Sequence, residues 1–150
     1  MIITGKYPKL RMRRSRKTDW MRRLVRENSL SSNDFILPIF VTEGKNKKNP
    51  INTMPEVFRY SVDKLGQIVD RALKLKIPRV AIFPQTYSGL KDSYGSEALN
   101  ENNLVCKAIT KIKDKYKNEI GIMTDVALDP YTSHGPVSYT HLTLPTITEV

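Results

Sequence analysis

Apolar and polar positions follow one another along the chain in blocks that predict strands and helices in alternation. Three short apolar runs have the form of strands covered on both faces of a sheet: residues 35–41, 79–83 and 120–126. Three segments carry apolar residues at helical spacing: residues 18–27, 61–76 and 104–116. From the first strand onward, the order strand, helix, strand, helix, strand predicts parallel pairing with right-handed crossovers, and therefore an α/β fold.

Prolines, a capping residue and polar segments set the expected limits of these strands and helices. Pro38 lies inside the first predicted strand, and proline has no N–H to donate, so this strand should be irregular, bulged or without a partner there. Pro84 is expected to stop the second strand, and Ser61 to cap the second helix. The polar segments 43–55 and 85–102 are interpreted as loops.

Charge is concentrated at the N-terminus. The chain of 150 residues has a formal net charge of +10, and its first thirty residues hold ten basic and two acidic side chains, a net +8. Such an arm can bind nucleic acid, an anionic membrane or another subunit, and it can equally be a solvated segment. Charge alone does not choose among these partners.

The single cysteine and the distribution of apolar residues indicate a cytoplasmic protein. Cys106 lies in a stretch with helical apolar spacing and is expected to be a buried small hydrophobe. Without a second thiol the chain can form neither an internal disulfide nor a thiolate zinc cluster, which fits a reducing compartment. No apolar run follows the N-terminal charges or reaches membrane-spanning length, so we expect no secretory signal and no membrane partner.

The three predicted strands fit an open sheet and a closed barrel equally well. A dinucleotide-binding sheet would need a glycine-rich turn after the first strand, and the loop after Val41 contains only Gly44. In a barrel, the functional groups lie in the loops that follow the carboxyl ends of the strands. The loops after the predicted strands are therefore where we look for chemistry.

The segment after the third predicted strand is the richest in such chemistry. Residues 124–135 read Thr-Asp-Val-Ala-Leu-Asp-Pro-Tyr-Thr-Ser-His-Gly. Asp125, Asp129 and His134 could form a metal or acid–base site. The alternative is that Asp129-Pro130 and the residues around His134 only build a turn.

This segment resembles the signature of the porphobilinogen synthase (5-aminolevulinate dehydratase) family. The resemblance extends over most of residues 10–135 through ordered motifs, among them Arg16-Lys17-Thr18-Asp19-Trp20, Ile36-Leu37-Pro38-Ile39-Phe40-Val41, Arg59-Tyr60-Ser61, Phe83-Pro84 and Lys91-Asp92 with Gly95-Ser96. Several motifs in the right order make a far more specific signal than any single short pattern.

The resemblance implies an α/β fold that is the N-terminal part of a TIM (β/α)8 barrel, truncated after about three strands. We expect a basic arm and first helix in residues 1–30 and a partial barrel in residues 31–135. The implied activity is that of a hydro-lyase, which condenses two molecules of 5-aminolevulinate to porphobilinogen in heme biosynthesis. The family uses two lysines, at least one of which forms a Schiff base with substrate. They lie on later strands, so this chain alone is expected to be inactive.

The resemblance also assigns site residues. Asp125 matches the family's aspartate beneath the substrate amino group, and Phe83 matches an aromatic position near the Schiff-base substrate. Zinc-dependent members have cysteines at the positions of Ala127 and Asp129. Because Asp129 offers a hard oxygen instead, it is the metal candidate, with magnesium favoured over zinc in the full-length enzyme and no organic cofactor. His134 is expected to shape the loop.

The resemblance gives the arm a partner as well. In the family it embraces a neighbouring subunit, which implies a homo-octamer or hexamer and no nucleic acid. Two other functions stay open: a small basic α/β RNA-binding protein, and a different Schiff-base barrel enzyme. The tail, residues 136–150, resembles a translated sequencing-library adapter, so we expect it to be non-native.

Overall fold

The computed structural model describes residues 5–8, 10, 11 and 13–135 and divides the chain into two compact units, Met1–Ser31 and Ser32–Val150. The expected non-native tail lies outside the described residues. The first unit contains the 3-10 helix η1 (Arg14–Arg16) and helix α1 (Asp19–Leu24), neither of which buries a residue. Helix α1 is shorter than the predicted 18–27. Its Trp20 and Leu24 side chains are exposed, so little tertiary packing is present to stabilise further helical turns.

The second unit is built on one five-stranded sheet with the strand order β2-β3-β1-β4-β5. Its strands are β1 (Ile36–Thr42), β2 (Lys48–Ile51), β3 (Met54–Ser61), β4 (Arg79–Gln85) and β5 (Gly121–Thr124). Strand β1 pairs in parallel with β3 and β4, and β4 pairs in parallel with β5. The predicted parallel α/β arrangement is confirmed.

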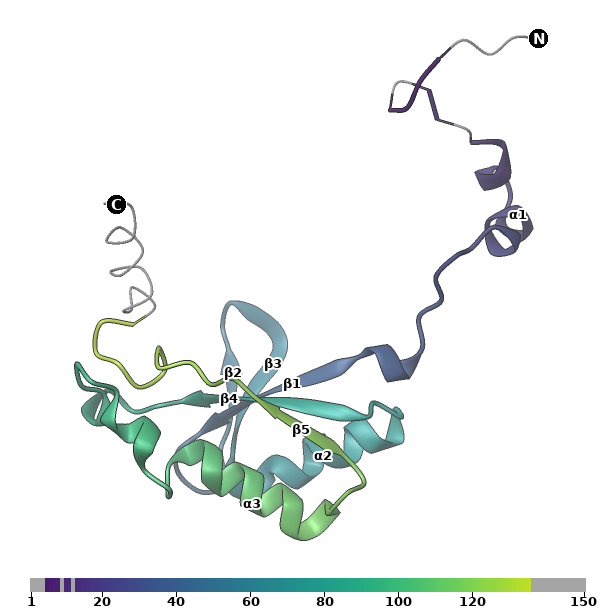
Figure 1. Ribbon diagram of the computed structural model, residues 1–150. Helices are drawn as coiled ribbons and strands as arrows, with labels where there is room; N and C mark the ends of the chain where they lie inside the picture. Colours follow the sequence, from purple (N-terminus) through teal and green to yellow (C-terminus); the bar gives the residue numbers. More distant parts are fainter. Residues whose placement is uncertain (1–4, 9, 12, 136–150) are drawn as a thin grey trace, which may run out of the picture. The chain divides into compact units, whose positions relative to one another are not determined.

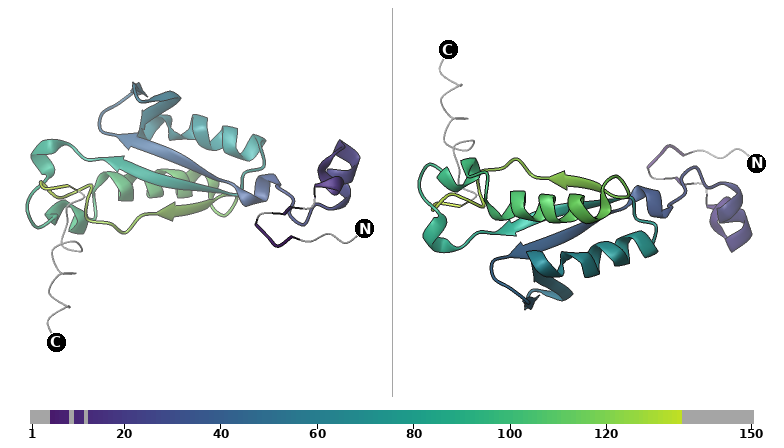
Figure 2. Two further views of the ribbon diagram at one scale, coloured as in Figure 1. Left: turned by 90° about the horizontal axis from the view of Figure 1, so that it is seen from above. Right: turned by 90° about the horizontal axis from the view of Figure 1, so that it is seen from below.

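Two helices cover one face of this sheet (Figures 1 and 2). They are α2 (Leu65–Lys74), which follows the 3-10 helix η3 (Val62–Lys64), and α3 (Leu104–Tyr116). The shorter 3-10 helices are η2 (Ser32–Asp34), η4 (Ser88–Leu90) and η5 (Ser96–Leu99). The core between sheet and helices includes Ile39, Val41, Leu65, Val69, Val80, Ile82, Ala108 and Ile112. Among the described residues, no helix is both long and apolar enough to cross a membrane.

The prediction of a loop over residues 43–55 is wrong, because much of this segment forms an antiparallel hairpin of β2 and β3. Asn49 is the partner of Arg59, and Pro50 is the partner of Phe58, with a register shift between Pro50 and Ile51. Strand β2 is the edge of the sheet, where proline and polar residues are tolerated. Its composition therefore resembles that of a loop.

The two prolines of the central strands behave differently from each other. The pairing of β1 with β3 begins only at Phe40, so Pro38 has no partner on that side, as predicted. Pro84 does not stop β4, because this strand continues to Gln85 with Pro84 paired to Val41. A proline fits inside a strand wherever the ladder does not require its N–H.

Two other expectations need correction. Ser61 precedes the helical segment but makes no side-chain cap. Its hydroxyl instead accepts a hydrogen bond from the Lys47 N–H at 2.9 Å and so ties the hairpin to the helix start. Cys106 is half-buried rather than buried. It lies two residues, about 200° around the helix, from both Leu104 and Ala108, which form the buried face of α3.

Candidate functional site

The sheet face opposite the helices presents Phe83, one of the predicted substrate-site residues, next to a second phenylalanine, Phe40. Strand residues alternate between faces. Ile39 and Ile82 are buried beneath the helices, so the adjacent Phe40 and Phe83 point to the other face. Phe40 and Phe83 are register partners, and their ring centroids lie 5.7 Å apart with an interplanar angle of 31°. They form an aromatic platform near the carboxyl ends of β1 and β4.

Asp125 lies at the same level of the sheet as this platform. Strand β5 ends at Thr124, whose partner on β4 is Ile82. Asp125 is the next residue after Thr124, just as Phe83 is the next residue after Ile82. The predicted strand over residues 120–126 is thus shorter in the structure, and Asp125 is an exposed residue at the start of the loop. The structure therefore brings the two predicted substrate-site residues to neighbouring strand ends.

A cavity of about 270 Å³ adjoins the platform. It is lined by Phe40, Arg59, Phe83, Pro84, Gln85, Thr86, Lys91 and Pro130. Asp125 and Asp129 are not among its lining residues. Arg59 and Lys91 belong to motifs that resemble the family, but no role was predicted for either residue. Their position beside two aromatic rings offers positive charge to an anionic group of a ligand.

The loop after β5 is a compact turn. The Tyr131 N–H donates to the Leu128 carbonyl oxygen at 2.8 Å, and the side chains of Tyr131 and Thr132 are buried. Burial raises the pKa of the Tyr131 phenol. Asp129 is half-buried within the turn, whereas His134 is exposed. The segment therefore builds a turn, and the metal-binding role of Asp129 stays a prediction.

The described residues do not assemble a metal site of their own. Across residues 5–8, 10, 11 and 13–135, no group of three or more His, Cys, Asp or Glu side chains is arranged to hold an ion. Asp129 could contribute one carboxylate, and Mg2+ requires an octahedral set of oxygen ligands. The remaining ligands would have to come from outside this part of the chain, or from water.

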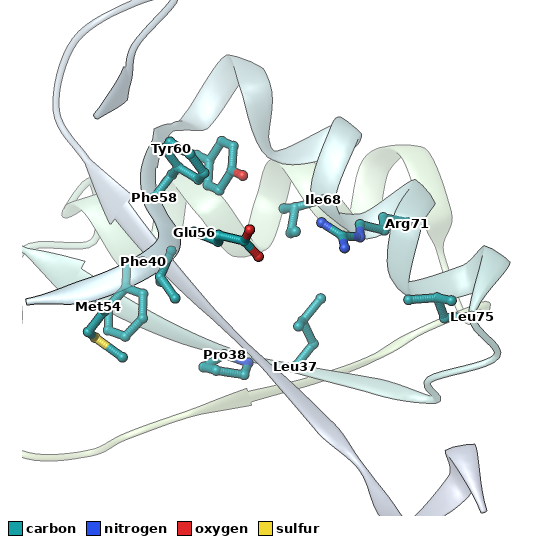
Figure 3. A pocket seen from close by; sticks show the side chains of 11 residues that line it. Leu37, Pro38, Phe40, Met54, Glu56, Phe58, Tyr60, Ile68, Arg71 and Leu75 are labelled. Atoms are coloured by element: carbon teal, nitrogen blue, oxygen red, sulfur yellow. The ribbon is translucent and has the colours of Figure 1, made fainter. Parts of the chain in front are cut away.

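A second cavity, of about 240 Å³, lies between β1, β3 and α2 and is lined by none of the predicted site residues (Figure 3). Its lining is mostly apolar, and the side chains of Glu56 and Arg71 point into it. Glu56 has a φ of 63°, a left-handed conformation that favours glycine. This cavity borders the first half of β1, where β3 does not pair. It is therefore an opening within the sheet, between β1 and β3, and it shares Phe40 with the first cavity.

Comparison with known proteins identifies relatives of the chain. The family model for delta-aminolevulinic acid dehydratase matches residues 9–147. A delta-aminolevulinic acid dehydratase of Bradyrhizobium diazoefficiens is 52% identical over 126 residues, which is 84% of this chain and 35% of the relative. The Chlamydia pneumoniae protein of the same name is 42% identical over 125 residues, covering 83% of this chain and 37% of the relative.

A solved structure is similar in fold as well as in sequence. It is the delta-aminolevulinic acid dehydratase (porphobilinogen synthase) of Toxoplasma gondii ME49 in complex with the reaction product porphobilinogen. The TM-score is 0.73 and the identity 34%, and the match covers 83% of this chain and 35% of that one. The neighbour is a TIM barrel, which confirms the predicted fold class. The chain thus spans about a third of the length of these relatives.

Proposed function

The chain belongs to the delta-aminolevulinic acid dehydratase family, and we propose that it forms part of a porphobilinogen synthase. The reaction joins two molecules of 5-aminolevulinate and releases two molecules of water. The observation that carries the proposal is the match of a family model to residues 9–147, together with the arrangement of Phe83 and Asp125 at neighbouring strand ends. This membership favours the synthase over the RNA-binding and other Schiff-base alternatives.

Asp125 and Phe83 are the residues of this chain that we assign to the substrate. The Asp125 carboxylate is exposed at the end of β5, where it can accept a hydrogen bond from an amino group and hold or move its proton. The Phe40–Phe83 platform provides an apolar surface next to it. An apolar wall with a few polar groups at its rim is the usual composition of a small-molecule site.

The groups that complete the reaction lie outside the described residues. We propose that the lysines that form the Schiff base belong to later strands of the full-length enzyme, where desolvation lowers the pKa of an amine and makes it nucleophilic. The family depends on a metal ion, and we propose magnesium with Asp129 as one contributor. Since the described residues do not complete a metal site, no step is assigned to the metal.

The basic arm has a separate proposed role. Helix α1 and its flanking residues expose Trp20, Leu24 and Val25 alongside many arginines. Exposed apolar and cationic side chains in one short segment are suited to bind a protein surface. We propose that the arm binds a second copy of the full-length protein in a homo-octamer or hexamer. Size-exclusion chromatography with light scattering, with and without residues 1–31, tests this assembly.

The activity is tested on the full-length enzyme by colorimetric detection of the pyrrole product. Wild-type enzyme should form porphobilinogen from 5-aminolevulinate, and residues 1–150 alone should form none. The Asp125→Asn variant should lose at least about 100-fold in kcat, because a positioned proton-transfer group contributes about 10²–10⁴-fold. Asp114→Asn makes the same chemical change at an exposed position of α3 and should leave kcat unchanged.

Two results would contradict these assignments separately. A full-length enzyme without porphobilinogen formation would overturn the proposed function. An Asp125→Asn enzyme with a kcat within threefold of wild type would overturn the role of Asp125 and leave the function standing.

A further inference from the structure

The loops after β4 and β5 meet at one residue that has no assigned role. Asp92 lies in the loop after β4 and forms an isolated parallel bridge with Thr132 in the loop after β5. The Asp92 N–H donates to the Tyr131 carbonyl oxygen at 3.3 Å, and the Ser133 N–H donates to the Asp92 carbonyl oxygen at 2.9 Å. Figure 1 shows the two loops beside each other at this point.

The side chain of Asp92 fixes its own loop in the shape that this bridge requires. Its Oδ1 accepts hydrogen bonds from the N–H of Tyr94 at 2.9 Å and of Ser96 at 3.1 Å. The loop between them turns at Gly95, which has a φ of +69° and faces Thr132. A carboxylate that bonds main-chain N–H groups two and four residues ahead holds such a turn closed. The same residue therefore shapes one loop and binds the other.

The segment between β5 and the bridge carries the proposed catalytic carboxylate. It is fixed at one end, where Thr124 pairs with Ile82, and at the other end, where Thr132 is buried against the Asp92 loop. Residues 125–127 belong to no helix or strand. Their path depends on the two fixed ends, and so does the position of Asp125.

We infer that Asp92 is a positioning residue, which holds the loop after β5 so that Asp125 stays at the level of Phe83. The role in catalysis rests on the proposed function, whereas the tethering of the loop does not. Asp92 touches no substrate in this assignment and acts through the main chain of residues 131–133. Displacement of a reacting group by about 1 Å can lower the rate about 100-fold, so a small movement of this loop is sufficient for a large effect.

The tether is tested by hydrogen exchange on the full-length enzyme. Asp92→Ala removes the acceptor for Tyr94 and Ser96, and we expect the Ser133 amide to exchange at least about tenfold faster. Asp92→Asn keeps a side-chain oxygen that can accept both bonds, so its exchange should stay within about threefold of wild type. Asp114→Ala is the matched control, and the amides of α3 report whether each variant is folded. Unchanged exchange at Ser133 in a folded Asp92→Ala enzyme would overturn the inference.

The effect on catalysis is tested by a double-mutant cycle with Asp125. Asp92→Ala should lower kcat about tenfold or more, and Asp92→Asn should restore it to within threefold of wild type. In the Asp125→Asn background, Asp92→Ala should add less than a twofold loss, because the group that it positions is already absent. A full tenfold loss in that background would show that Asp92 acts independently of Asp125. The exchange experiment is valid even if the enzyme forms no porphobilinogen, so failure of the proposed function is recognised separately.

Discussion

The two faces of the central sheet differ in a way that explains both the stability and the chemistry of this chain. On the face beneath α2 and α3, Ile39, Val80 and Ile82 are at most 1% exposed. On the opposite face, Phe83 of β4 is 37% exposed and Met123 of β5 is 45% exposed. All three strands were expected to be covered on both faces, and this expectation is wrong for the described residues. One face supplies the core, and the other presents the candidate site.

The largest effect should come from truncating the covered face. Ile82→Ala should lower the free energy of unfolding of the chain by about 3 kcal/mol, since it deletes buried methylene groups and leaves a cavity. Phe83→Ala removes a larger side chain from the adjacent position but should cost less than about 1.5 kcal/mol, because that ring is partly hydrated already. Urea unfolding followed by circular dichroism measures both. Equal losses would contradict the division into two faces.

The next largest effect concerns the hydrogen bond that fastens the covering helices together. The Tyr116 hydroxyl on α3 donates to Asp70 Oδ1 on α2 at 2.6 Å, and the main-chain carbonyl oxygen of Gly66, also on α2, lies 2.9 Å from the same hydroxyl. Tyr116→Phe should lower the free energy of unfolding by about 1.5 kcal/mol. Tyr94→Phe, at an exposed tyrosine, is the control and should change it by less than about 0.5 kcal/mol.

A smaller effect is expected at the start of α3. The Asn103 side chain caps this helix by accepting a hydrogen bond from the Cys106 N–H at 2.9 Å. Asn103→Ala should therefore cost about 1 kcal/mol in thermal or urea unfolding. Thr18 precedes α1 without a side-chain cap bond, so Thr18→Ala should cost clearly less. A larger loss in the free energy of unfolding for Thr18→Ala than for Asn103→Ala would show that the residues around α1 contribute more to stability than their exposure indicates.

The smallest effect is a pH dependence at the surface of the helical layer. The hydrogen bond from Tyr116 lowers the pKa of Asp70 below its ordinary value of 3.8, and Lys115 at 3.3 Å adds to this. Because the folded pKa is below the unfolded one, the stabilisation is present above about pH 4 and is lost as the pH falls through the folded value. Asp70→Asn should make unfolding less sensitive to pH between 5 and 3. NMR titration of Asp70 with a pKa at or above 3.8 would contradict this.

The sequence predicted the elements with strong periodicity well and the edge of the sheet poorly. Helix α3 matches its predicted limits, residues 104–116, because buried residues recur along it every four positions. The β2–β3 hairpin was missed since its pairs, such as Asn49 with Arg59, contain polar residues at an exposed edge. Pro84 lies inside β4 although local rules would end the strand there.

The candidate site was predicted only in part. Phe83 and Asp125 were chosen by resemblance, and the structure places them at neighbouring strand ends, although their roles stay predictions. Arg59 and Lys91 were given no role because nothing in their local sequence indicates the cavity that they line. Asp92 was likewise noted only within a motif, since its bond to Ser133 joins two separate loops.

By itself, the sequence determined the α/β class, the parallel pairing of the three predicted strands and the family, because periodicity and ordered motifs can be recognised from the residues along the chain. The tertiary structure alone decided which face of each strand stays open, where the hairpin pairs, and how Asp92 joins the loops after β4 and β5. These features depend on register and loop path between residues distant in the chain. The propensities of neighbouring residues do not predict such contacts, since these contacts stabilise the protein only after the sheet has formed.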